Sequence, residues 1–117
     1  MKEQQELVGN WQREAYSQEL LTPEHRLARA SMEWDELILE VEQSGNMEAM
    51  AEEAVDVIIT LLGFIDTTGF DAQDLVNKKI ELMYEKYNPE QLALFKEQGM
   101  SELEAIAEAK RLWEIAC

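Results

Sequence analysis

The feature that most constrains this chain of 117 residues is the apolar run from Ala54 to Ile65, "AVDVIITLLGFI". The run is too long for a typical buried strand and too short to span a bilayer, so it predicts a buried helix. Its one charged residue, Asp56, stands between Val55 and Val57. A carboxylate among residues that favour burial is costly unless a cation or hydrogen-bond donors compensate it. A functional interpretation therefore has to explain Asp56.

The remainder of the chain has the periodicity and the boundary signals of helices. We expect helices over residues 3–20, 23–43, 47–67, 71–87 and 89–98, and from residue 101 to the end. Thr22 and Pro23 are typical of a helix start, and the Asn88–Pro89 pair is typical of a helix end. No stretch alternates with period two for long enough to predict a strand. The sequence therefore predicts an all-α bundle in one domain, residues 1–117, with the helix over 47–67 at its centre.

The charge balance excludes one class of function. Acidic residues number 25 and basic residues 10, which gives a formal net charge of −15. A surface this acidic repels the phosphate backbone, so we expect no nucleic-acid partner. Cys117 is the only cysteine, and the start "MKEQQELVGNWQ" lacks the apolar core of a signal peptide. We expect a cytoplasmic protein without a membrane partner.

Two neighbouring predicted helices carry carboxylates on one face. The first set falls within about 60° of arc on a helical wheel and consists of Glu33, Glu36 and Glu40. In the second helix, Glu53 and Asp56 lie one turn apart, with Glu52 beside them. If the two faces meet, their repulsion grows as water is removed, and a hard cation such as Mg²⁺ reverses it by taking oxygen ligands.

A plainer interpretation of these carboxylates stays open. Because acidic residues make up 25 of 117 positions, pairs three or four residues apart also arise on solvated helix faces. Glu40 and Glu52 fit a solvated surface as well as they fit a metal site. Asp56 could instead pair with a Lys or Arg side chain. Spacing alone does not decide between these alternatives.

The helix expected over 71–87 carries cations. Lys79 and Lys86 are seven residues apart, two turns along one face, with Met83 between them and Tyr87 next to Lys86. Such lysines are commonly solvated. In so acidic a chain, they also fit a pair of cations that face a triphosphate.

Taken together, these patterns resemble the all-α nucleoside triphosphate pyrophosphatases. That family includes MazG-like proteins, dCTP pyrophosphatases, dimeric dUTPases and phosphoribosyl-ATP pyrophosphohydrolase. Its motifs are E-E-x-x-E on one helix, E-E-x-x-D on the next and K-x3-N-x2-[RK]-Y on a third. This chain has M-E-W-D-E at 32–36, E-E-A-V-D at 52–56 and K-I-E-L-M-Y-E-K-Y at 79–87. The order and gaps of the motifs agree over residues 22–89. Met32 and Met83 depart from the pattern at a usual glutamate and a usual asparagine.

The resemblance implies a four-helix bundle core of the MazG-like type with additional C-terminal helices, assembled as a homodimer or homotetramer. It implies hydrolysis of a nucleoside triphosphate between the α- and β-phosphates, in nucleotide-pool cleaning, with Mg²⁺ or Mn²⁺ as cofactor. The alternatives are a relative that acts on phosphoribosyl-ATP or dUTP, and a non-catalytic helical interaction protein.

The implied catalytic and metal-binding residues are Glu33, Glu36, Glu53 and Asp56, with Glu40 and Glu52 as accessory carboxylates. The implied substrate-binding residues are Lys79, Lys86 and Tyr87. Trp11 and Trp34 are candidates for stacking on a base, although packing in a core or a dimer interface explains each of them better.

Overall fold

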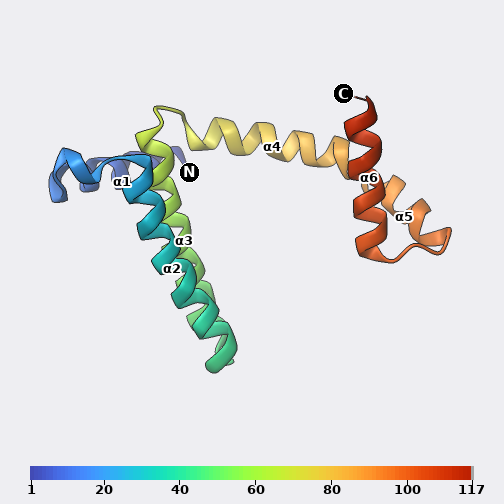
Figure 1. The fold of residues 1–117 in the computed structure, drawn as a ribbon, viewed down its shortest axis with the longest axis horizontal. Helices are drawn as coiled ribbons and strands as arrows, with labels where there is room; N and C mark the ends of the chain where they lie inside the picture. Colours follow the sequence, from blue (N-terminus) through green and yellow to red (C-terminus); the bar gives the residue numbers. More distant parts are fainter. Residues whose placement is uncertain (117) are drawn as a thin grey trace. The chain divides into compact units, whose positions relative to one another are not determined.

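The computed structural model describes residues 1–116, and Cys117 lies outside the described residues. The helices are α1 (Lys2–Ala15), α2 (Pro23–Gln43), α3 (Met47–Thr67), α4 (Ala72–Lys86), α5 (Pro89–Glu97) and α6 (Glu102–Ala116), with a short 3₁₀ helix at Gln18–Leu20 (Figure 1). Residues 1–116 contain no strand, so the predicted all-α class is confirmed. None of the described helices is long and apolar enough to cross a membrane.

Local chemistry fixes the ends of the two longest helices. The Thr22 hydroxyl accepts a hydrogen bond from the His25 amide at 3.3 Å, and Pro23 occupies the first turn of α2. The Asn46 side chain accepts from the Ala49 amide at 3.1 Å at the start of α3. Each cap satisfies an amide that has no partner inside its helix. The predicted bounds of 23–43 and 47–67 are therefore confirmed.

The first helix is shorter than predicted. It ends at Ala15 rather than at residue 20, because Tyr16 has an extended backbone with φ −119° and ψ 151°. The Tyr16 ring meets the Trp11 ring edge to face at a centroid distance of 5.4 Å, and the Arg26 guanidinium lies 4.6 Å from its centre. These tertiary contacts outweigh the local preference for a continuing helix.

The chain divides into two compact units, Met1–Asp74 and the residues from Leu75 onward. In the first unit, α2 and α3 form an antiparallel hairpin, and α1 packs on α3 (Figure 1). Because α3 contacts both neighbours, it is the central helix of this unit. In the second unit, α5 packs on α6. The four-helix core and the single domain that the sequence predicts stay predictions.

The buried face of α1 is polar. The Gln5 side chain donates to the Phe70 carbonyl at 2.9 Å and accepts from the Ala72 amide at 2.6 Å. Gln12 donates to the Gly63 carbonyl at 3.1 Å. Gly63 permits this approach, because a Cβ there would lie 2.5 Å from Gln12 Oε1. Hydrogen bonds to the main chain therefore hold α1 in place where sequence analysis would look for apolar packing.

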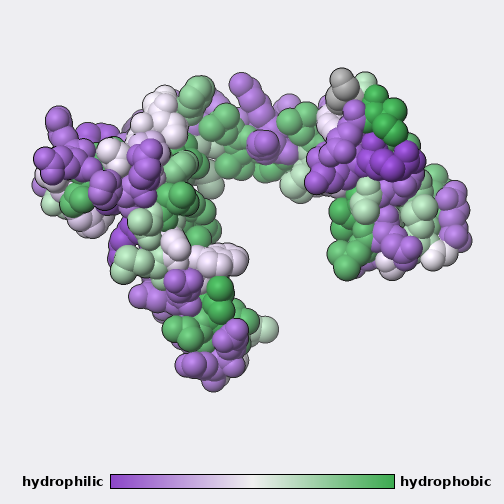
Figure 2. Space-filling view, in the orientation of Figure 1, coloured by the Kyte–Doolittle hydropathy of each residue, from purple (hydrophilic) through white to green (hydrophobic). Residues whose placement is uncertain are grey.

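Much of the apolar run stays uncovered within the described chain. Only Leu62 and Gly63 of α3 are buried, and the exposed side chains include Val55, Ile58, Ile59 and Leu61. Hydrophobic atoms also appear in green on the surface of the α2–α3 hairpin in Figure 2. The run is a helix, as predicted, but its burial is only partial.

The contact between Gly63 and Gln12 can be tested by Gly63→Ala. The added methyl group overlaps Gln12 Oε1, and Gln12 is buried, so it has little room to move. We expect a net loss of about 1–2 kcal/mol in the free energy of unfolding, because overpacking exceeds the gain in helix propensity. Urea unfolding measures the change. In a Gln12→Ala background the same substitution should be neutral or stabilising, and equal destabilisation in both backgrounds would contradict this packing.

Candidate functional site

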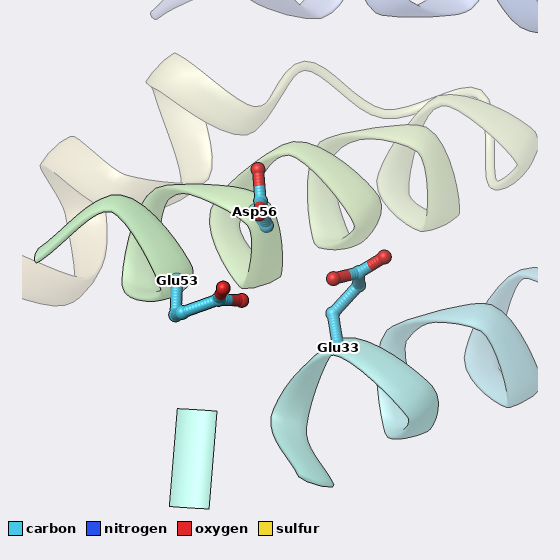
Figure 3. A group of neighbouring side chains, drawn as sticks. All are labelled: Glu33, Glu53 and Asp56. Atoms are coloured by element: carbon cyan, nitrogen blue, oxygen red, sulfur yellow. The ribbon is translucent and has the colours of Figure 1, made fainter. Parts of the chain in front are cut away.

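Three of the predicted carboxylates meet between α2 and α3. Glu53 and Asp56 extend from adjacent turns of α3, and Glu33 extends from the facing α2 (Figure 3). One oxygen from each lies within 4.8 Å of the others. The antiparallel hairpin produces this cluster, because it sets the middle of α2 against the first half of α3. We refer to Glu33, Glu53 and Asp56 as the acidic cluster.

The members of the acidic cluster differ in exposure. Glu33 is buried, and its Oε1 lies 2.7 Å from Nη2 of Arg29. Glu53 has a buried oxygen, Oε2, with no hydrogen-bond partner among the described residues. Asp56 is exposed. The apolar neighbours of Asp56 therefore do not bury it: Glu33, on the facing helix, is the more buried carboxylate, and both side chains line one cavity.

Burial and nearby charges work against ionisation of two members of the acidic cluster, Glu33 and Glu53. The pKa of Glu33 is raised, first because burial removes water and then because the Glu36 carboxyl lies close, although Arg29 opposes the shift. The pKa of Glu53 is also raised, first by burial and then by the charges of Glu36 and Asp56. Ionisation of Glu33 and Glu53 at neutral pH therefore lowers the free energy of unfolding. A bound cation would offset this loss.

A cavity of about 180 Å³ opens beside the acidic cluster, within the first unit. Glu33 and Asp56 form its acidic part. The other side chains that give it chemical character are the aromatic rings of Trp11 and Tyr16, the guanidinium groups of Arg26 and Arg29, and the amide of Gln12. Anionic, cationic and aromatic groups therefore line one small space, which is suited to a ligand that is itself part charged and part aromatic.

The other predicted carboxylates lie around the acidic cluster rather than in it. Glu36 is outside the group of three, but it is near enough to raise the pKa of both Glu33 and Glu53. The charges of Glu40 and Glu52 act on Glu53 to a smaller extent. Their assignment as ligands or as accessory groups stays a prediction.

The predicted substrate-binding and base-stacking residues lie at three separate cavities. Trp11 lines the cavity beside the acidic cluster, whereas Trp34 lines a shallow apolar hollow on α2 and α3. A cavity of about 280 Å³ in the second unit is lined by Lys79, Lys86 and Tyr87, together with Leu82, Met83 and Trp113. Within it, Lys86 Nζ lies 5.2 Å from the centre of the Tyr87 ring.

Sequence reasoning missed Arg26 and Arg29. A usable signal was present, because the two arginines precede Glu33 by seven and four residues and so share its helix face. Trp113 was missed as a partner of the lysines, since no sequence pattern connects α6 with α4.

Comparison with protein-family models, with characterised proteins and with solved structures finds no match for this chain. The site is therefore defined by its own geometry: an acidic cluster in an α-helical hairpin, bordered by an aromatic and cationic cavity. The family resemblance carried by the three motifs stays a prediction.

The raised pKa of Glu53 predicts the effect of Glu53→Gln on the stability of the metal-free protein. Because the folded-state pKa of Glu53 is raised above its usual 4.5, the stability of the wild type should rise as the pH falls from 7 towards 4.5. Glu53→Gln should raise the melting temperature at pH 7 and reduce this pH dependence, since the amide removes a charge and can donate to a neighbouring carboxylate.

Scanning calorimetry in EDTA at several pH values measures this effect. Glu42→Gln, at an exposed position of α2, is the matched control and should leave the pH dependence close to that of the wild type. A lower melting temperature for Glu53→Gln at pH 7 would show that the ionised carboxylate stabilises the metal-free fold, contrary to this account.

Proposed function

We propose that this protein is a Mg²⁺-dependent nucleoside triphosphate pyrophosphohydrolase that releases a nucleoside monophosphate and pyrophosphate. The observation that carries the proposal is the acidic cluster with its unpartnered Glu53 oxygen, set beside a cavity lined by aromatic and cationic groups. The three sequence motifs, which resemble those of the all-α pyrophosphatases, support the same activity. Nucleotide-pool cleaning is the role that such an activity would serve.

The acidic cluster fits a hard divalent cation. All its donor atoms are carboxylate oxygens, the ligand type that Mg²⁺ and Mn²⁺ take in proteins. The buried Glu53 Oε2 accepts no hydrogen bond within the part of the chain that the structure describes, and a cation would satisfy it. Glu33, Glu53 and Asp56 would hold the ion, which when bound would neutralise charge on the triphosphate.

The remaining charged groups then have separate roles. Glu36, outside the acidic cluster but close to it, would hold the attacking water and accept its proton. Arg29, freed from Glu33 when that carboxylate binds the cation, would donate to a phosphate oxygen. Lys79 and Lys86, which line the cavity of the second unit, are further candidates for binding phosphate.

Assembly into a homodimer or homotetramer is part of the proposal. The supporting observation is the set of exposed apolar side chains on the α2–α3 hairpin, among them Leu27, Trp34 and Ile58. Apolar surface of this extent is typical of a protein that buries it against a partner. A second copy of the hairpin would supply the missing cover.

Two variants separate metal binding from catalysis. Glu53→Gln should lose both the Mg²⁺-dependent rise in melting temperature and the release of pyrophosphate, because it removes a ligand. Glu36→Gln should keep most of the thermal shift and lose pyrophosphate release by about 100-fold or more, because it removes only the proton acceptor. Thermal shift assays and a coupled pyrophosphate assay on a panel of nucleoside triphosphates, phosphoribosyl-ATP included, give both readouts.

The same panel tests the alternatives. Turnover of dUTP or phosphoribosyl-ATP alone would place the protein with those relatives. No pyrophosphate from any nucleotide by a folded, Mg²⁺-stabilised wild type would overturn the enzymatic proposal and favour a non-catalytic helical protein. Glu42→Gln serves again as the control and should match the wild type in both assays.

A further inference from the structure

Arg26 is a buried cation without an anionic partner. Arg26 is only 7% exposed, yet it forms no ion pair with any described residue. Its Nε donates to the Leu20 carbonyl at 2.9 Å, and its guanidinium carbon lies 4.6 Å from the centre of the Tyr16 ring. The two terminal nitrogens donate to no atom of the described residues, and the side chain lines the cavity beside the acidic cluster. Neither nitrogen is sealed from solvent, so both are available in the cavity to a ligand that supplies hydrogen-bond acceptors.

The position of Arg26 along α2 indicates which part of a ligand it meets. Arg26 precedes Glu33 by seven residues, or about 10 Å along the helix axis, and Arg29 lies between them. A phosphate held by a cation in the acidic cluster would be near Glu33 and Arg29. A group that extends from that phosphate along the cavity would reach Arg26 and the aromatic rings of Tyr16 and Trp11. In a nucleotide, that group is the base.

We propose that Arg26 selects the base, a specificity that rests on the proposed nucleotide hydrolysis. Stacked on Tyr16, its guanidinium presents a planar pair of N–H donors, which match an edge with two adjacent acceptors. Guanine has such an edge at O6 and N7, and cytosine has one at O2 and N3. Adenine and uracil lack a neighbouring pair of this kind, because an amino group or a ring N–H stands next to the acceptor. Trp11, at the same cavity, offers a face for the ring.

The first test is the base preference of hydrolysis. Wild-type kcat/KM should favour cytosine and guanine nucleotides over adenine and uracil nucleotides by about tenfold or more, the usual discrimination of a bidentate contact. Arg26→Lys keeps the charge but removes the planar pair of donors, so it should abolish the preference while retaining the Mg²⁺-dependent thermal shift. Arg13→Lys is the matched control, since Arg13 pairs with Asp66 and is absent from the cavity lining. Survival of the preference in Arg26→Lys would overturn the assignment.

The second test does not require hydrolysis. Trp34→Phe with Trp113→Phe leaves Trp11 as the only tryptophan and therefore a fluorescent probe of the cavity. Titration with the four nucleoside monophosphates in EDTA should show tighter binding of the cytosine and guanine compounds, lost in Arg26→Lys. Selective binding without pyrophosphate release would keep the Arg26 proposal and overturn the enzymatic one. Hydrolysis without base selectivity would keep the enzymatic proposal and overturn the Arg26 proposal. Equal binding of all four monophosphates, with loss in Arg26→Lys, would show that Arg26 binds phosphate and would overturn base selection.

Discussion

The structure depends on three carboxylates that two helices hold together against their mutual repulsion. Folding of the α2–α3 hairpin places Glu33 beside Glu53 and Asp56, and it leaves one Glu53 oxygen buried without a hydrogen-bond donor from residues 1–116. Burial raises the pKa of Glu33 and Glu53, and Arg29 compensates only Glu33. A fold selected for stability alone would gain by removing one of these charges. Under the proposed function, a bound cation would relieve this repulsion.

The inner face of α2 orders charge along one line. Arg26, Arg29 and Glu33 follow one another at helical spacing. The cavity beside them is lined by the Arg26 guanidinium, which lies over the Tyr16 ring, and by carboxylates of the acidic cluster. A nucleotide has the complementary order, from base to phosphates to metal. On the other side of the same cavity, the Gln12 side chain donates to the Gly63 carbonyl, and the missing side chain of Gly63 lets α1 approach α3. Fold and candidate site thus share the same close packing.

The sequence predicted what depends on local chemistry. Side-chain caps at Thr22 and Asn46 set the starts of α2 and α3, and helical spacing placed Glu53 beside Asp56. It failed where side-chain packing, and not helical spacing, decides the structure. Tyr16 leaves the helical conformation to contact Trp11 and Arg26, which no local pattern encodes. The hydrophobic neighbours of Asp56 indicated burial, yet Glu33 is the buried acid, because burial follows from how α2 crosses α3. The apolar run indicated a buried helix, but the described residues of this chain leave many of its side chains exposed to solvent.

The most direct test of the central claim is a titration with Mn²⁺, followed by electron paramagnetic resonance of the free ion, at two pH values. If the acidic cluster is a metal site, the wild type binds the ion with an affinity that rises from pH 5 to pH 7, as protons leave carboxylates whose pKa is raised. Glu53→Gln weakens this binding, whereas Glu42→Gln does not. Equal binding by the wild type and Glu53→Gln at both pH values would contradict the account, because the ions would then be held by the acidic surface in general.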